Sequence, residues 1–396
     1  MQHKIICVAY IFVFETQINY CFTSEIQIYI YDFMKPFTPH DLPLKKLDWK
    51  KFRKQIGPAN RALARYDGIL QSIPNPAVLL SPLTTQEAVL SSKIEGTQAT
   101  LEEVLKYEAD PKRQTKHYQD IQEVINYRKA MAYAVEELHQ RPISLNLLKR
   151  IHSILLDSVR GQNKNRGNFR KIQNWIGKPG ASQKEARYVP PDPLKLPGFL
   201  DKFEKYIHHD DDDIIVQVAI IHAQFEILHP FLDGNGRIGR ILIPLFFYSK
   251  GVLHRPMFYI SAFLEANRPE YYDKLKDISD NNSWEEWITF FLKAVINQAN
   301  RNTDKAQQIL ELYNNMKQKI VDYTHSQYAL QALDGLFTIP IFSSRDFQNH
   351  SDIPKASSAR IINVLKDEGV ITTIEEARGS KPALYQFQRL IDIVNQ

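Results

Sequence analysis

The stretch HPFLDGNGRIGR, residues 229–240, decides the fold, because it sets twelve mostly polar residues between two strongly apolar segments. The preceding segment, 214–228, and the following one, 241–249, are both predicted to be buried helices. Gly234 and Gly236 allow backbone conformations that other residues avoid. We expect them to turn consecutive N–H groups inward at the start of the second helix, which forms a nest for an anion.

The polar side chains of this loop favour a polyphosphate ligand. Arg237 and Arg240 lie three positions apart on the first helical turn, and arginine binds phosphate oxygens bidentately. Asn235 can donate to a phosphate oxygen, and Asp233 offers the hard oxygen ligand that Mg²⁺ prefers. His229 ends the first helix, where a neutral imidazole can accept a proton from an attacking hydroxyl. Each residue alone is more often structural, but the combination at this spacing indicates a functional site.

Composition limits the other classes of function. A chain of 396 residues has room for two or three domains. The formal charge of +5 is spread thinly and does not favour nucleic acid, which requires a clustered basic face. Cys7 and Cys21 are the only cysteines, so a disulfide framework and a downstream cysteine nucleophile or cysteine-ligated zinc are excluded. This cysteine usage fits a cytoplasmic protein.

The first 33 residues differ from the rest of the chain. The apolar run at 5–14 is too short to span a bilayer as a helix, and no signal-type cleavage site follows it. We expect Met34 to be the natural start and 1–33 to be an upstream or disordered extension. A signal or anchor segment and a structural strand are the alternatives.

The remaining chain is predicted to be mostly helical, apart from two places. NFRKIQNWIG and EARYV flank the turn-forming residues 178–181, which predicts a β-hairpin at 168–189 that the prolines after it end. The four acids at 210–213 suggest a metal site, but adjacent side chains cannot all converge on one ion. They fit better as the negatively charged start of the helix at 214–228.

The C-terminal residues predict a small separate domain. Residues 344–347 and 356–368 suggest two short helices, and 370–374 with 383–387 suggest a hairpin, so that the order is that of a winged helix. Between 343 and 387 six positive charges balance six negative ones, which gives little drive for DNA binding. A protein-interaction or dimer-organising role is therefore favoured over a DNA-binding regulator.

At this point the loop is identified as similar to the signature of the Fic family, HPF-x-DGNGR-x-x-R, at every specified position. The resemblance extends over nearly all of the chain after Met34 and is to the group with an N-terminal inhibitory helix. It implies a mainly α fold: a Fic-type helical bundle with an inserted β-hairpin flap and a small C-terminal winged-helix domain. The regions are then 34–116 with the inhibitory helix, a catalytic core at 117–300, a connecting helix at 301–320, and the winged helix at 321–396.

The resemblance implies protein adenylylation, in which a target hydroxyl (Ser, Thr or Tyr) attacks the α-phosphate of Mg-ATP and pyrophosphate leaves. His229 would be the base, Asp233 would hold Mg²⁺, and Arg240 would contact the γ-phosphate. The other nucleotide-binding residues implied are Gly234, Asn235, Gly236, Arg237 and Gly239 of the loop, Ala186, Arg187 and Tyr188 of the flap, and Tyr271 and Tyr272 near the adenine. The two tyrosines fit equally well as core residues.

An upstream segment matches the inhibitory pattern of the same group, [S/T]-x-x-x-E-[G/N]. It reads SSKIEG from Ser91 to Gly96, within a helical pattern that is interrupted near Gly96. By this resemblance, the Glu95 carboxylate occupies the guanidinium of Arg240, and ATP then binds in a pose unsuited to attack. The alternative is an exposed glutamate beside a helix-capping glycine.

Three other functions stay open at this point. The same site could remove AMP from a modified protein, with Glu95 positioning water. It could transfer phosphate or another phosphate-containing group, although the intact loop favours a triphosphate. The protein could also sense nucleotide without transferring it. The resemblance further implies a possible homodimer, and no membrane association is expected.

Overall fold

The computed structural model describes residues 35–159, 161, 163–177, 182–379 and 381–396. The extension at 1–33 and the turn predicted at 178–181 lie outside the described residues. The main body is helical and contains α1 (Arg53–Ser72), α2 (Pro76–Leu79), α3 (Ser81–Ile94), α4 (Leu101–Ala109), α5 (Tyr118–Leu138), α6 (Leu145–Leu155), α7 (Leu196–Ile207), α8 (Ile214–Leu228), α9 (Asn235–Ser249), α10 (Ser261–Ala266), α11 (Arg268–Asn281) and α12 (Trp284–Thr324), with two 3₁₀ turns, η1 (Trp49–Lys51) and η2 (Gln183–Glu185).

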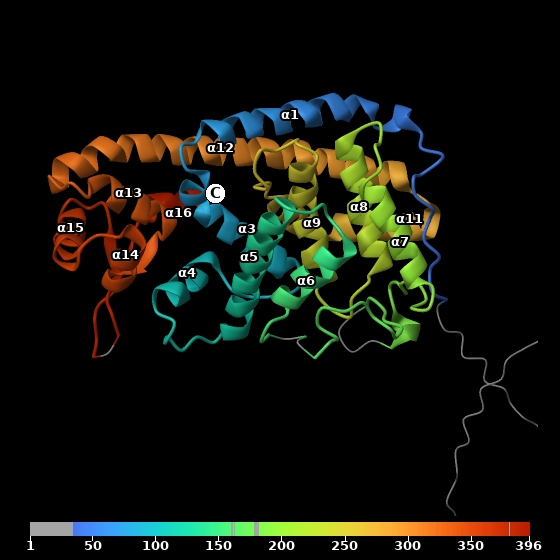
Figure 1. The fold of residues 1–396 in the computed structure, drawn as a ribbon, viewed down its shortest axis with the longest axis horizontal. Helices are drawn as coiled ribbons and strands as arrows, with labels where there is room; N and C mark the ends of the chain where they lie inside the picture. Colours follow the sequence, from blue (N-terminus) through green and yellow to red (C-terminus); the bar gives the residue numbers. More distant parts are fainter. Residues whose placement is uncertain (1–34, 160, 162, 178–181, 380) are drawn as a thin grey trace, which may run out of the picture.

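Helices α8 and α9 are the buried centre of this body (Figure 1). Helix α8 begins where the acidic run ends, because Asp213 is its N-cap and its carboxylate accepts the N–H groups of Ile215 and Val216 at 2.9 Å each. The predicted helix at 214–228 is thus confirmed. The described residues contain no group of three or more His, Cys, Asp or Glu side chains placed to hold a metal ion.

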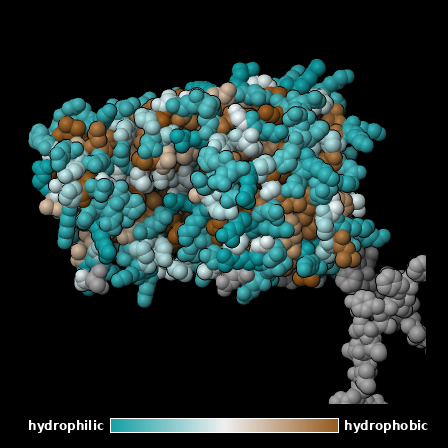
Figure 2. Space-filling view, in the orientation of Figure 1, coloured by the Kyte–Doolittle hydropathy of each residue, from teal (hydrophilic) through white to brown (hydrophobic). Residues whose placement is uncertain are grey.

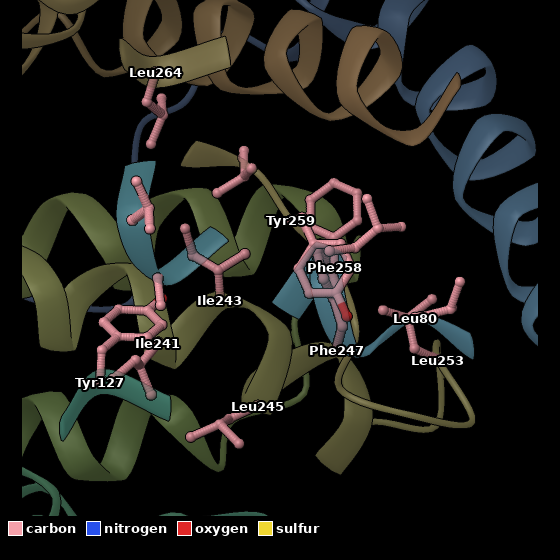
Figure 3. Close-up of a cluster of buried hydrophobic side chains, with 14 of the residues drawn as sticks. Leu80, Tyr127, Ile241, Ile243, Leu245, Phe247, Leu253, Phe258, Tyr259 and Leu264 are labelled. Atoms are coloured by element: carbon pink, nitrogen blue, oxygen red, sulfur yellow. The ribbon is translucent and has the colours of Figure 1, made fainter. Parts of the chain in front are cut away.

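The core continues around α9 and above it. Figure 3 shows Phe247 of α9 beside Phe258 and Tyr259, with Leu80 and Leu253 next to them. The rings of Phe247 and Phe258 meet edge to face with centroids 5.6 Å apart. This packing fixes the body of α9, so its first turn, which follows the polar loop, is held on a rigid support.

Helix α12 is 41 residues long and runs the length of the molecule beside α1 (Figure 1). The connecting helix expected at 301–320 is the second half of this single helix. Its composition becomes more polar after residue 300, although Asn302 is still buried and donates to the Tyr259 carbonyl at 3.3 Å. The boundary predicted between 300 and 301 stays a prediction, since no break in the backbone marks it.

The C-terminal region contains α13 (Ala329–Thr338), β1 (Ile341–Ser343), α14 (Ser344–Ser351), α15 (Lys355–Asp367), β2 (Thr372–Glu375), β3 (Leu384–Gln386) and α16 (Gln388–Asn395). The three strands form an antiparallel sheet in the order β1-β3-β2, with Ile341 and Thr372 both opposite Gln386. The two helices and the hairpin expected here are therefore present. Helix α13, strand β1 and helix α16 were not predicted.

The β-hairpin expected at 168–189 needs correction. In the described residues it is reduced to one isolated bridge between Ile176 and Tyr188. The second arm begins with a 3₁₀ turn instead, because Ser182 and Glu185 form a capping box in which the Ser182 N–H donates to the Glu185 carboxylate at 3.0 Å. We call residues 173–177 and 182–189 together the flap.

The surface gives two further limits. On the face in Figure 2 hydrophilic residues predominate, and apolar residues form small separate groups. Within the described part of the chain, none of the helices combines the length and the apolarity that crossing a membrane requires.

Candidate active site

The loop between α8 and α9 is bent by two left-handed residues. His229 closes α8 with φ 44° and ψ 59°, and Gly234 precedes α9 with φ 76°. Glycine adopts this conformation freely, whereas a histidine in it is uncommon and has to be held by its surroundings. The N–H of His229 donates to the Phe225 carbonyl at 3.0 Å, which is the last bond of α8.

Arg170 holds the histidine in place. It is 2% exposed, and its Nε donates to the His229 carbonyl at 2.9 Å while its backbone N–H donates to the Pro230 carbonyl at 2.9 Å. The guanidinium also donates to the carbonyl of Pro191 and, at 3.4 Å, to that of Leu228. Burial lowers the pKa of Arg170 to about 10. Sequence reasoning missed this residue, since nothing in its neighbours marks it as buried.

Asn235 closes the loop on itself. Its side-chain oxygen accepts the Phe231 N–H at 2.9 Å, and its Nδ2 donates to the Phe231 carbonyl at 2.9 Å. Phe231 is fully buried and stacks on His152 with ring centroids 3.9 Å apart. The amide predicted to donate to phosphate is therefore engaged within the loop, and at most one of its N–H groups can face a phosphate.

His152 is a second residue that sequence reasoning missed. Its Nδ1 accepts the Gly167 N–H at 2.8 Å, so the proton is on Nε2, which donates to the Asp233 carbonyl at 3.1 Å. Burial lowers the pKa of His152 to about 4, which keeps the ring neutral at pH 7. The ring thus supports the backbone of the loop from below.

The two arginines of the first turn of α9 have different partners. Arg237 Nη1 donates to Glu123 at 2.8 Å, and both side chains are 4% exposed. Its Nη2 lies 3.4 Å from Asp233, whose side chain is 40% exposed. A Cβ added at Gly161 would lie 2.7 Å from the Asp233 carboxylate, so the backbone there lies close against it. The guanidinium of Arg237 is therefore fixed between two carboxylates of the main body.

Arg240 is paired with the end of α3. It is 1% exposed, and its Nη2 donates to Glu95 Oε1 at 2.6 Å. Its Nε donates to the Ser91 hydroxyl and its Nη2 to the Ser91 carbonyl, both at 2.8 Å. A Cβ added at Gly236 would overlap Glu95 Oε1, so the carboxylate lies directly against the first turn of α9. The structure thus brings Glu95 and Arg240 together, 145 residues apart in sequence.

The local backbone explains why Glu95 can reach the loop. Helix α3 ends at Ile94 with Glu95 as its C-cap, and Gly96 reverses the chain with φ 102°. Helix α4 then starts after a capping box formed by Thr100 and Glu103. Burial raises the pKa of Glu95, but the Arg240 guanidinium outweighs this and holds it below its usual value. The carboxylate is therefore charged at neutral pH.

Two other carboxyl groups lie behind this pair. Burial raises the pKa of Glu226 on α8 to about 8, and a Cβ added at Gly239 would overlap its Oε1. Burial likewise raises the pKa of Glu87 on α3 to about 7. Glu87 accepts the Ser261 hydroxyl at 2.6 Å and the Ser261 N–H at 3.1 Å. Neither carboxyl had been singled out in the sequence.

His229 is suited to accept a proton. Burial lowers its pKa to about 4, although the charge of Glu95 raises it, so the imidazole is neutral at pH 7. Its Nδ1 is buried and has no hydrogen-bond partner among the described residues. A neutral imidazole at the end of α8 can accept a proton, which is what the predicted role of general base requires.

The flap residues lie at the side of the same loop. The Tyr188 hydroxyl donates to the Ile227 carbonyl at 2.8 Å, and exposed Arg187 forms an ion pair with Asp273 of α11. Ala186 follows η2 in an extended conformation. The structure therefore places the second arm of the flap next to the end of α8, two residues from His229.

The two tyrosines have separate environments. Tyr271 is 1% exposed, and its hydroxyl donates to His222 Nε2 at 2.9 Å. The Nδ1 of His222 in turn donates to the Gly239 carbonyl at 3.0 Å. Tyr271 thus supports α9 from the core, which agrees with the alternative that it is a core residue. Tyr272 is half-buried, and its hydroxyl lies 3.5 Å from the Ile94 carbonyl, beside Glu95.

The comparisons with known proteins identify a family for this chain. Two family profiles match: "Fic/DOC family N-terminal" over residues 53–136 and "Fic/DOC family" over residues 142–247. The probable protein adenylyltransferase aq_aa38 of Aquifex aeolicus is 26% identical over 194 residues, which cover 47% of this chain and 56% of that protein. The protein adenylyltransferase Fic of Drosophila grimshawi is 29% identical over 128 residues, covering 31% of this chain and 24% of that one. The chain therefore spans about half the length of the first relative and a quarter of the second.

Two crystal structures have the same fold. A Fic family protein from Desulfovibrio desulfuricans matches with a TM-score of 0.53 and 19% identity over 89% of this chain and 98% of that one. A Fic domain containing signaling protein from Bacteroides thetaiotaomicron matches with a TM-score of 0.52 and 16% identity over 64% and 97%. With the loop, the helical body and both profiles in agreement, this chain belongs to the Fic/DOC family and has the Fic N-terminal region ahead of its Fic domain.

Proposed function

We propose that this protein transfers AMP from Mg-ATP to a hydroxyl side chain of a protein and that Glu95 inhibits the transfer. One observation carries the proposal: a carboxylate of the chain itself lies against the N-terminal turn of α9, bound to Arg240 at 2.6 Å. The names of the Aquifex and Drosophila relatives support the same chemistry.

The position of Glu95 supports a phosphate site because its carboxylate oxygens take the place of phosphate oxygens. A helix N-terminus favours negative charge, and the turn after Gly234 presents its N–H groups to that charge. Arg237 adds a buried guanidinium whose Nε has no hydrogen-bond partner among the described residues. An ATP molecule would place its phosphates over this turn, with Arg240 available to the γ-phosphate once Glu95 has moved away.

Asp233 fits the Mg²⁺ that the family implies. It is the half-exposed carboxylate beside the turn, and Mg²⁺ is commonly held by one or two carboxylates together with substrate phosphates. When bound, the ion would neutralise charge on the phosphates. The close backbone of Gly161 and the 3.4 Å contact with Arg237 orient the carboxylate for that role.

In the proposed transfer each residue of the site has its own role. The target hydroxyl gives its proton to neutral His229, and its oxygen forms a bond to the α-phosphorus of ATP. The bond from that phosphorus to the bridging oxygen of the β-phosphate breaks, and pyrophosphate leaves with the electron pair. Arg237 and the turn of α9 stabilise the charge on the phosphates, and Arg170 holds His229 in its left-handed conformation.

Labelling with ATP that has ³²P at the α-position tests the proposal. Glu95→Gly should increase label on protein, and His229→Ala in the same background should remove it. The matched control is Glu102→Gly, because this carboxylate is on α4 and pairs only at 3.8 Å with Lys106. Equal labelling by the wild type and Glu95→Gly would refute inhibition by Glu95. Labelling that survives His229→Ala would refute the proposed base.

Removal of AMP from a modified protein is the second candidate. The charge of Glu95 acts on His229, and the Glu95 side chain is one-third exposed. Glu95 therefore lies where its carboxylate could orient a water molecule. Incubating a labelled target with wild type and Glu95→Gly distinguishes the two directions. Loss of label that requires Glu95 would favour removal.

For the C-terminal region we propose a winged-helix domain that binds protein. The order of α13, β1, α14, α15, β2 and β3 supports this fold. Arg113, in the turn after α4, donates to both carboxylate oxygens of Glu375 on β2, at 2.6 and 2.7 Å. The hairpin is thus occupied by a contact with the main body, which argues against insertion into DNA. A salt-dependent gel shift would contradict the proposal.

A further inference from the structure

The chain segment before α1 lies against the flap. Residues 35–41, which we call the strap, begin the blue trace at the right edge of Figure 1 and contact α7 and α8. The N–H of Phe37 donates to the Val189 carbonyl at 3.0 Å, and the Phe37 ring lies 6.0 Å from that of Tyr188. The strap thus meets the second arm of the flap through both backbone and side chain.

These contacts place the second arm between two neighbours. The carbonyl of Tyr188 accepts the Ile176 N–H at 2.8 Å, whereas the carbonyl of Val189 accepts from Phe37. Successive carbonyls of an extended chain point in opposite directions. The second arm is therefore covered by the strap on one edge and by the first arm on the other.

The same arm is tied to the catalytic histidine. The Tyr188 hydroxyl donates to the Ile227 carbonyl at 2.8 Å, two residues before His229. The Phe37 ring packs against Tyr188. A shift of the strap would therefore reach the end of α8 through one aromatic side chain.

The strap itself is anchored by three helices of the body. Gln224 of α8 donates to the His40 carbonyl at 3.3 Å, and Trp284 at the start of α12 donates to the His40 ring at 3.3 Å. Lys202 of α7 forms an ion pair with Asp41 at 2.6 Å. These anchors hold the strap in place even where its own residues are exposed.

We propose that the strap positions the flap for the protein acceptor, with Phe37 as the positioning residue. By covering the edge of the second arm, it directs an acceptor strand to the first arm, where Trp175 is 42% exposed and follows Ile172, the 62% exposed residue just before the flap. An acceptor that offers an apolar side chain next to its hydroxyl fits this arm. The inference rests on the proposed function, because it assigns the flap a role in binding the acceptor.

Hydrogen–deuterium exchange tests the structural half without any labelling reaction. The amides of Ile176, Arg187 and Tyr188 are bonded within the flap. In Phe37→Ala they should exchange about 2- to 10-fold faster, the factor that corresponds to loss of one aromatic pair. Leu44→Ala is the matched control, since Leu44 is also half-buried and lies further along the same segment. Unchanged exchange in Phe37→Ala would overturn the proposal.

Kinetics test the functional half in a Glu95→Gly background, with the His229→Ala chain as the acceptor. Phe37→Ala should raise KM for this acceptor by about 2- to 10-fold and leave KM for ATP unchanged. Phe37→Tyr keeps the ring and should restore the parent values.

Two kinetic results would overturn the proposal: an unchanged KM for the acceptor, or an equal rise in both KM values. If the Glu95→Gly parent labels nothing, the proposed function has failed, and the exchange experiment still decides whether the strap holds the flap.

Discussion

The contacts of the Glu95 carboxylate allow an estimate of how much its removal should raise the labelling rate. The substitution Glu95→Gly deletes a charge-assisted hydrogen bond of 2.6 Å to a guanidinium that is 1% exposed. Bonds of this kind contribute about 1.5–3 kcal/mol. If ATP has to displace the carboxylate before transfer, that amount corresponds to a rise in labelling rate of about 10- to 150-fold. Glu95→Gln, which keeps an oxygen but no charge, should fall between wild type and Glu95→Gly.

The same substitution should lower stability. Leaving a buried charge without its partner costs about 3–5 kcal/mol when the pair is fully buried. Glu95 is one-third exposed and Ser91 still binds Arg240 twice, so we expect about 1–2 kcal/mol. For a chain of this length that lowers Tm by about 1–3 °C.

Added ATP separates this explanation from general damage. ATP at about 100 times its Kd stabilises the folded state by about 2.7 kcal/mol, which exceeds the expected loss. The rise in Tm on adding ATP should therefore be larger for Glu95→Gly than for wild type, where Glu95 competes. Thermal unfolding with and without Mg-ATP measures this difference. A smaller ATP-induced rise in Glu95→Gly, or higher labelling with no change in the ATP effect, would refute competition for Arg240.

Four further changes test individual parts of the site. His229→Ala should lower labelling by about 10²- to 10⁴-fold without changing ATP affinity, and parallel loss of both would contradict its role as base. Arg170→Met should lower Tm and labelling together, because four carbonyl groups lose their donor; normal labelling would show that His229 keeps its conformation unaided. Glu87→Gln should flatten the pH dependence of Tm. The pKa of Glu87 is about 7 in the folded state against 4.5 ordinarily, so the stability that this carboxyl contributes is complete below pH 4.5 and is lost as the pH rises through 7. Gly96→Ala should raise labelling through backbone strain at φ 102° alone, since nothing lies within 4 Å of the added Cβ. Gly68→Ala in α1 is the control: its added Cβ is equally open but its φ is not positive, so labelling should not change.

The fold was predictable where a local signal marks each end of an element. Helix α8 has an acid run before it and a histidine–proline pair after it, and its predicted bounds are correct. Helix α12 was divided in the prediction because its composition changes after residue 300, although the helix continues. Strand β1 has three residues, which are too few to show an alternating pattern. In the flap, a 3₁₀ turn replaces part of the strand that was predicted there. The errors therefore lie where tertiary contacts override a short pattern.

The site was predictable to the extent that its residues are adjacent in sequence. The family is confirmed, and the loop places Asp233, Arg237 and Arg240 around one helix turn. Arg170 and His152 were missed because what distinguishes them is burial under this loop, which sequence periodicity does not reveal. Their roles, like those predicted for the loop residues, stay predictions until the variants are measured.

The contacts also bear on how the proposed inhibition by Glu95 would be released. The loop is braced at several points, by Arg170 under His229 and by the amide of Asn235 across the turn. Glu95, in contrast, follows the last residue of α3 and is followed by a glycine in a conformation that only glycine adopts easily. A change of the backbone at Glu95 and Gly96 would move the carboxylate relative to α3 and leave the loop unchanged. If Glu95 inhibits as we propose, release is expected to involve a change at the end of α3, caused by a partner that acts on that helix or on the segment after it.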